Sequence, residues 1–122
     1  MLYTKKDQPF SMKDFENPGS EYRGAPFWAW NTRLDSDIIS RQVEVLHEMG
    51  FGGFHAHVRT GLDTPYMTPE FLGYMKQCCA LAKEKQMLLW LYDEDRWPSG
   101  AAGGAVTKDL RFCERLLRIS PT

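Results

Sequence analysis

Apolar and polar positions along the chain change period repeatedly, and the changes predict strands that alternate with helices. Residues 25–31 (APFWAWN) form a short aromatic run between Pro26 and a polar stretch, which is typical of a strand. Residues 51–59 (FGGFHAHVR) and 87–95 (MLLWLYDED) are the second and third strand candidates. The third is apolar almost without interruption, which predicts a strand buried on both faces.

Three further segments have apolar residues at helical spacing. Residues 36–50 follow the first strand, with Asp35 or Ser36 as the N-cap and Gly50 as the C-terminal stop. Residues 68–86 begin with the helix-starting pair Thr68-Pro69. Residues 108–119 (KDLRFCERLLRI) are the third helix candidate.

The resulting order, β-α-β-α-β-loop-α, predicts an α/β fold whose strands are parallel and joined by right-handed crossovers. A chain of 122 residues has room for one domain. We expect an irregular lead-in over residues 1–24 and the α/β domain over residues 25–122. In such a sheet, binding and catalytic groups collect where the carboxyl ends of the strands meet.

Polar or aromatic residues end all three predicted strands, whereas the strand bodies are apolar. They are Trp30 and Asn31 after the first strand, His55, His57 and Arg59 in the second, and Asp93, Glu94 and Asp95 after the third. This asymmetry predicts a functional site at one edge of the sheet.

The acidic triplet has two interpretations. The carboxylates bind a hydroxyl-rich substrate or act as an acid or base, or they serve as helix caps with a salt bridge to Arg96. Strand alternation would turn Asp93 and Asp95 to one side and Glu94 to the other. We favour the functional interpretation because Trp97 and a glycine-rich loop directly follow the acids.

The tryptophans also have a structural and a functional interpretation. Trp28 and Trp90 lie within strands, and we expect them in the core. Trp30 and Trp97 stand at strand ends, where an exposed indole offers an apolar plate for the C–H face of a sugar ring.

His55 and His57 share one side of their strand, a spacing that some metal hydrolases use. Asp93 or Asp95 on the neighbouring strand would have to complete such a site. Hydrogen-bonding histidines in a polar pocket are the interpretation that we favour. The glycine-rich loop at residues 99–105 does not match the spacing of a dinucleotide-binding fingerprint.

The charge of the chain gives no reason to expect nucleic acid or membrane as a partner. The formal net charge is −1, the pI is about 6.3, and no basic stripe is present. No apolar run approaches the length of a membrane span, and the N-terminus lacks a secretory signal. Three cysteines, two of them adjacent, favour a reducing compartment, so we expect a cytoplasmic location.

Four segments together resemble a known group of enzymes. PFWAWN, EMGFGG, HVRTGLDTPYMTPEF and WLYDEDRWPSGAAGG are similar to the N-terminal part of glycoside hydrolases close to the α-L-rhamnosidases of family 106. The resemblance covers residues 17–115. It implies the first part of a (β/α)8 barrel, with strands at 25–31, 52–58 and 87–93.

The resemblance also implies a sugar-facing mouth, an inverting mechanism with two carboxylates, and calcium as an assisting ion, with no other cofactor expected. The implied mouth residues are Asn31, His57, Arg59, Asp93, Glu94, Asp95 and Trp97. His55 departs from the family pattern, which has an apolar or acidic residue there, and this weakens the metal interpretation of the histidine pair.

A (β/α)8 barrel needs about 250 residues, and this chain supplies three strand-helix units. We expect the catalytic pair on later strands, so the chain would bind carbohydrate but be inactive alone. Its uncovered sheet edge predicts a homo-oligomer or pairing with the remainder of the barrel. The alternatives are a metal-dependent hydrolase that uses His55 and His57, and a carbohydrate-binding or interaction module without catalysis.

Overall fold

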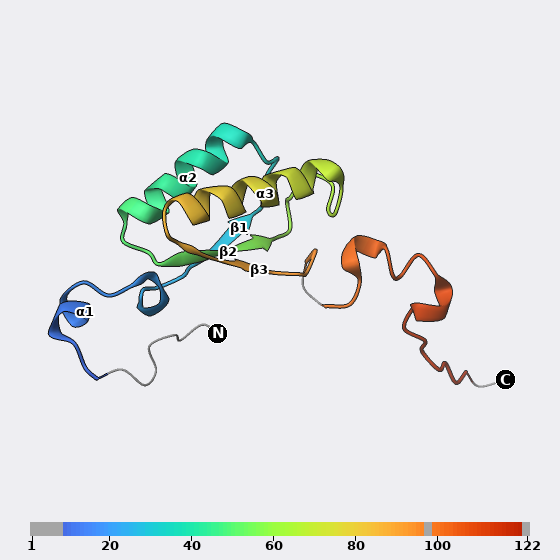
Figure 1. The fold of residues 1–122 in the computed structure, drawn as a ribbon. Helices are drawn as coiled ribbons and strands as arrows, with labels where there is room; N and C mark the ends of the chain where they lie inside the picture. Colours follow the sequence, from blue (N-terminus) through green and yellow to red (C-terminus); the bar gives the residue numbers. More distant parts are fainter. Residues whose placement is uncertain (1–8, 97–98, 121–122) are drawn as a thin grey trace.

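A computed structural model describes residues 9–96 and 99–120 of the chain. Two long helices cover one face of a three-stranded sheet, and the two ends of the chain extend away from this core (Figure 1). The elements in order are α1 (Met12–Glu16), η1 (Ser20–Tyr22), β1 (Phe27–Trp30), α2 (Ser36–Glu48), β2 (Gly53–Val58), α3 (Pro69–Glu84), β3 (Leu88–Leu91), η2 (Ala102–Gly104) and η3 (Leu110–Phe112).

The sheet has the order β1-β2-β3, and both strand pairs are parallel. In the register, Phe27 lies beside His55, and His55 lies beside Trp90. Three parallel strands that alternate with helices confirm the predicted α/β fold of βα units. All three strands are shorter than expected, and β3 already ends at Leu91.

Both long helices begin where the sequence predicts. The Asp35 carboxylate accepts hydrogen bonds from two backbone amides at the start of α2, and Gly50 follows this helix with a φ of 82°. The Thr68 hydroxyl accepts from the amide of Phe71 at the start of α3, where Pro69 is the first residue. No helix in residues 9–96 and 99–120 has the length and apolarity needed to cross a bilayer.

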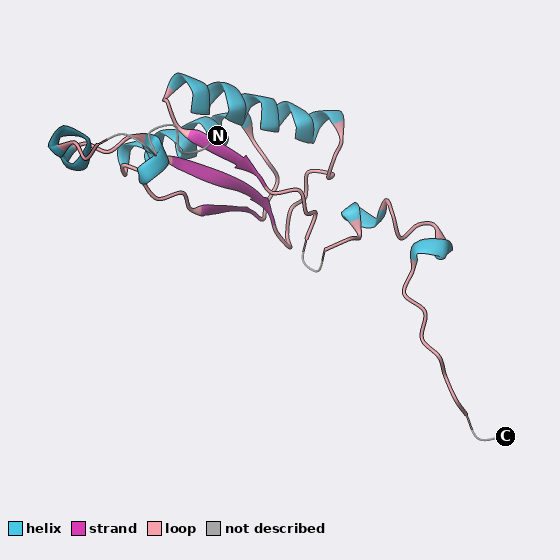
Figure 2. Cartoon of the chain, turned by 60° about the horizontal axis from the view of Figure 1, so that its bottom comes forward, coloured by secondary structure: helices cyan, strands magenta, loops and turns pink. Residues whose placement is uncertain are grey.

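The core lies between the sheet and the two helices. Figure 2 shows both helices on the same side of the sheet, and no described helix covers the opposite side. Alternate strand residues point into this core, and the helices contribute one apolar face each. Its buried residues are Trp30, Leu34, Ile39, Val43, Phe54, Ala56, Val58, Phe71, Met75, Cys78, Ala82 and Met87. At the edge of the core, the Trp28 indole donates a hydrogen bond to the Gln42 side chain.

The predicted third helix at residues 108–119 is wrong. The structure has one short turn there, η3 (Leu110–Phe112), and no helix over residues 113–119. The large apolar side chains of this segment do not belong to the described core, and Leu117 is 90% exposed. A short helix is marginal in water without such packing, so its pattern alone is not enough.

The described part of the lead-in contains α1 and η1 in otherwise irregular chain. It contacts the amino-terminal ends of the strands: the Ser20 hydroxyl donates to the carbonyl of Gln86, and the amide of Gly52 donates to the carbonyl of Gly24. An apolar hollow of about 460 Å³ lies within this segment, lined by Phe10, Phe15 and Tyr22 among others. It is formed by the lead-in alone, so it is separate from the carboxyl ends of the strands.

A matched pair of glycine substitutions should affect stability in opposite directions. A Cβ atom at Gly53 would overlap the carbonyl oxygen of Leu88 and lie 2.6 Å from the Trp90 ring. At Gly73, within α3, no heavy atom lies within 4 Å of that position. We expect Gly53→Ala to lower the free energy of unfolding by about 1–3 kcal/mol, and Gly73→Ala to raise it by about 0.5–1 kcal/mol.

Urea denaturation followed by tryptophan fluorescence measures both values. Equal stability of Gly53→Ala and the unmodified chain would contradict the tight contact between β2 and β3.

Candidate functional site

Rings from all three strands line the sheet face that the helices leave uncovered. The His55 ring stacks against Phe27 on one side, at a centroid distance of 4.8 Å, and against Trp90 on the other, at 4.9 Å. These are the pairs that the strand register sets side by side. Trp90 therefore belongs to this face, and the expectation that it packs in the core is wrong, because its register partner is His55.

His57 lies in the next row of the same face. Its ring contacts Tyr92 at 4.0 Å and Phe27 at 5.4 Å, both edge-on, and the residue is only 7% exposed. Burial lowers the pKa of His57, and the nearby charges of Arg59 and His55 lower it further. His57 is therefore neutral at neutral pH.

The two histidines of this face each have an unmatched polar atom. The Nδ1 atoms of His55 and His57 are buried without a hydrogen-bond partner in the part of the chain that the structure describes. Buried polar atoms without partners are rare and carry a cost in free energy. Because both atoms are closed to solvent, a ligand on the surface of this face would reach them only if the rings moved.

The loops that follow β1 and β2 are joined to each other. The amide of Arg59 donates to the carbonyl of Trp30 at 3.0 Å, and the buried Thr64 hydroxyl accepts from the amide of Leu34 at 2.9 Å. Asn31 and Arg59 are both exposed at this edge. Two of the predicted site residues are thus presented by neighbouring strand ends.

Trp30 does not offer an exposed ring. It is 3% exposed and packs edge-on against Trp28 at 5.5 Å and Phe71 at 5.8 Å, on the helix side of the sheet. It alternates with Ala29 along β1 and therefore shares the inward side with Trp28. The exposed position expected for Trp30 is wrong, and its indole N–H is buried without a partner among the described residues.

The acidic triplet follows β3 rather than ending it, so the alternation expected for its side chains does not apply. Asp95 is 7% exposed and forms an ion pair with Arg96, at 3.0 Å from Nη2 and 3.1 Å from Nε. Asp93 is exposed and Glu94 is half-buried. Asp95 therefore fits the structural interpretation, in which an acid pairs with Arg96, whereas Asp93 is open to solvent.

Tyr66, which the sequence analysis did not select, lies beside the acids. Its hydroxyl donates to the carbonyl of Asp93 at 2.9 Å. Burial raises the pKa of Tyr66, and the carboxylates of Asp95, Asp93 and Glu94 raise it further. Gly103 from the glycine-rich loop also approaches this point, since a Cβ there would lie 3.1 Å from the Tyr66 ring and 3.4 Å from Asp95 Oδ2. The conformations of the loops that carry Tyr66 and Gly103 bring these residues next to the acids. Sequence spacing does not predict those conformations.

The described residues do not support a metal site. Among residues 9–96 and 99–120, no group of three or more histidine, cysteine, aspartate or glutamate side chains is arranged to hold an ion. The set of His55, His57 and Asp93 or Asp95 that the sequence suggested is therefore not such a group. The last predicted site residue, Trp97, lies outside the described residues.

The fold defines a class of protein: an α/β sheet of βα units with parallel strands and two free edges. No protein-family model matches the chain, and no curated protein matches it significantly. Among solved structures, a rhamnosidase from Novosphingobium sp. PP1Y is similar over 74% of this chain, with a TM-score of 0.59 and 23% sequence identity. The match covers 9% of that rhamnosidase chain, so it shows a shared fold over a small part of a much longer protein.

The burial of His57 predicts a pH dependence of stability. Because its pKa is lowered from about 6.5, the unfolded chain binds more protons at this residue as the pH falls through and below that value. Stability should therefore fall between about pH 7.5 and about pH 5.5, a range in which histidine titrates and most carboxylates do not. In His57→Gln this fall should be smaller.

Urea midpoints at the two pH values give the measurement, and His47→Gln, on the exposed side of α2, is the matched control. An unchanged pH dependence in His57→Gln would contradict the role given to burial.

Proposed function

We propose that the chain forms the first three βα units of a glycoside hydrolase barrel related to the α-L-rhamnosidases, and that its strand ends bind carbohydrate. One observation carries the proposal: the three parallel strands end at the same edge, beside an uncovered face of aromatic and histidine rings. The fold shared with part of a rhamnosidase agrees with it.

The chemistry of this edge suits a neutral sugar. A sugar ring has apolar C–H faces, which pack on aromatic rings, and hydroxyls, which need both donors and acceptors. Phe27 begins β1 and is 64% exposed on the uncovered face, where its ring lies 5.9 Å from Tyr92 near the end of β3, so it takes the stacking role first expected of Trp30. His57 is 7% exposed and borders this surface with its imidazole ring, which packs edge-on against Tyr92. Arg59 adds donors and Asp93 adds acceptors.

The binding residues in this proposal come from all three strand ends. They are Asn31, His57, Arg59, Asp93 and Glu94, with Asp95 acting through its ion pair to Arg96. Trp97 stays a candidate on the strength of the sequence resemblance alone. Trp30 is left out because it is buried in the core.

The proposed role is binding and not catalysis. An inverting glycosidase needs two carboxyl groups roughly 6.5–9.5 Å apart on opposite sides of the bond that is cleaved. Asp93 and Asp95 come from a single short loop, and Asp95 is held by Arg96. The catalytic pair is therefore assigned to βα units beyond the three described, and the isolated chain should not hydrolyse glycosides.

Ligand-observed NMR with L-rhamnose tests the binding role. We expect saturation transfer from the chain to the sugar, and an affinity about tenfold lower in Asp93→Asn, since a hydrogen bond to a charged group contributes about 1.5–3 kcal/mol. Asp37→Asn removes one carboxylate from the first turn of α2 and should leave the affinity unchanged.

Absence of any sugar binding by the unmodified chain would contradict the proposal. Hydrolysis of a nitrophenyl rhamnoside by the isolated chain would contradict the assignment of catalysis to other units.

A further inference from the structure

The loop between β2 and α3 contacts the loops that follow both neighbouring strands. On the β1 side, the buried Thr64 hydroxyl accepts a hydrogen bond from the amide of Leu34. A Cβ atom at Gly61 would lie 2.7 Å from the carbonyl oxygen of Asn31, and the φ of 104° at Gly61 also favours glycine. This loop is therefore held closely against Asn31, one of the residues of the proposed site.

On the β3 side, a tyrosine of the same loop reaches the acids. The Tyr66 hydroxyl donates to the main-chain carbonyl of Asp93 at 2.9 Å. Its ring packs edge-on against the core residue Phe71, at a centroid distance of 5.2 Å. Burial and the neighbouring carboxylates raise the pKa of Tyr66, so the hydroxyl keeps its proton well above neutral pH. It therefore connects the acids to a ring that the core holds in place.

Residues 93–96 have one hydrogen bond to another segment of the described chain, and it is the bond from Tyr66. Strand pairing does not hold this stretch, because β3 ends at Leu91. The ion pair between Asp95 and Arg96 joins adjacent residues, so it does not connect the stretch to any other part of the chain.

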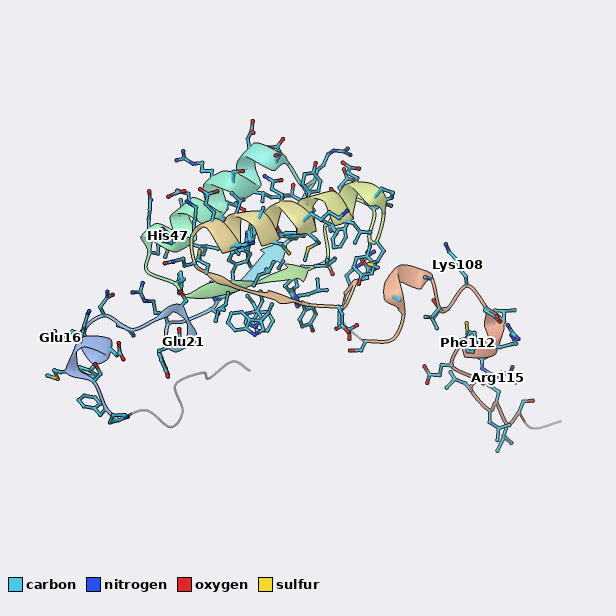
Figure 3. The ribbon with its side chains drawn as sticks, in the orientation of Figure 1. Glu16, Glu21, His47, Lys108, Phe112 and Arg115 are labelled. Atoms are coloured by element: carbon cyan, nitrogen blue, oxygen red, sulfur yellow. The ribbon has the colours of Figure 1, made fainter. Side chains whose placement is uncertain are left out.

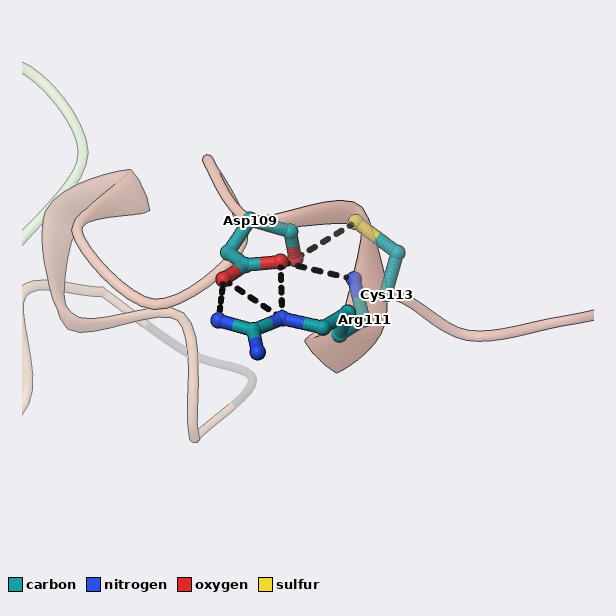
Figure 4. A network of polar contacts seen from close by, with 3 residues as sticks. All are labelled: Asp109, Arg111 and Cys113. Atoms are coloured by element: carbon teal, nitrogen blue, oxygen red, sulfur yellow. Dashed lines mark hydrogen bonds and ion pairs between the residues drawn. The ribbon is translucent and has the colours of Figure 1, made fainter.

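A local pair of an acid and an arginine does not by itself hold a segment against the core. Asp109 pairs with Arg111 and accepts a hydrogen bond from the Cys113 thiol, all within one turn (Figure 4). Figure 3 nevertheless shows Phe112 of that turn well away from the sheet and its two helices. The ion pair that follows β3 is still more local, and this leaves the Tyr66 hydroxyl as the link that fixes the acids.

The glycine-rich loop lies on the other side of this contact. Gly103 has a φ of 65°, and a Cβ atom there would lie 3.1 Å from the Tyr66 ring and 3.4 Å from Asp95 Oδ2. Gly104 also has a positive φ, 86°, but apart from its chain neighbours no heavy atom of the described residues lies within 4 Å of its Cβ position. The two glycines therefore differ in contact with Tyr66 and not in the sign of φ.

We propose that Tyr66 is a positioning residue of the strand-end site: its hydroxyl fixes Asp93 relative to Asn31 and so sets which sugar hydroxyls the two can bind together. The inference rests on the carbohydrate binding proposed above. Tyr66 acts through the main chain of Asp93, while the same loop contacts Asn31 at Gly61. Binding groups that are held in place before the ligand arrives lose less freedom when it binds.

Backbone order parameters, from amide relaxation measured by NMR, test the positioning without any sugar. Tyr66→Phe keeps the ring and removes only the hydroxyl, and we expect the amides of residues 93–95 to become more mobile. The amides of residues 110–112 are the internal control and should not change. Tyr74→Phe removes a tyrosine hydroxyl from α3 and should leave both groups unchanged. Unchanged order parameters at residues 93–95 in Tyr66→Phe would overturn the proposal.

The affinity for L-rhamnose tests the consequence for binding. Tyr66→Phe should bind the sugar about fivefold more weakly, which is the effect of losing one neutral hydrogen bond. In Asp93→Ala, which has no carboxylate left to position, the same change should cost less than about twofold. A tyrosine that touches the sugar itself would cost the same factor in both chains, and one that matters only for stability would cost nothing in either. Both results would overturn the positioning role.

A matched pair of glycine variants gives an independent check. Gly103→Ala should weaken sugar binding, because the added methyl group displaces the Tyr66 ring or Asp95. Gly104→Ala adds a methyl group at a positive φ without that contact, and it should keep the affinity of the unmodified chain. Equal losses in the two variants would count against the proposal. If the unmodified chain binds no sugar, the proposed function fails, and the order parameters still decide whether Tyr66 holds the acids.

Discussion

The register of the three parallel strands determines which side chains face the helices and which face the uncovered side of the sheet. With Phe27, His55 and Trp90 side by side, every second residue of each strand faces the uncovered side, and the remainder face the helices. A shift of one residue in β2 would place His55 and His57 in the core and Phe54 and Ala56 in solvent. The apolar surface that Phe54 and Ala56 bury against the helices opposes such a shift. It therefore also keeps His55 and His57 on the uncovered face.

The parts of the fold that local signals encode could be predicted from the sequence. The caps at Asp35 and Thr68 and the alternation of strands with helices depend on near neighbours in the chain, and the structure contains them. The side to which a strand residue points depends instead on where pairing begins and ends. Trp30 and Trp90 were therefore assigned to the wrong faces, and the alternation expected of the acids fails because β3 ends at Leu91.

Two further differences arise from contacts between distant residues. Tyr66 reaches the acids because the loop between β2 and α3 bends toward the end of β3, and no spacing rule predicts that path. Residues 108–119 have apolar residues at helical spacing and an N-cap at Asp109, but their large apolar side chains are exposed in the structure. Local preference starts a helix, and tertiary burial decides whether it continues.

The two surfaces left open by the fold are chemically different, and they lie on opposite faces of the same sheet. The ring face consists of aromatic and histidine rings that stack across the three strands. The helix face has exposed apolar flanks, at Leu91 and around Trp28, which suit another protein surface. Further βα units paired at the free edges would bury the flanks, and the rings would stay on the side opposite the helices. The two surfaces remain separate because alternate strand residues point to opposite sides of the sheet, and the register determines which residues those are.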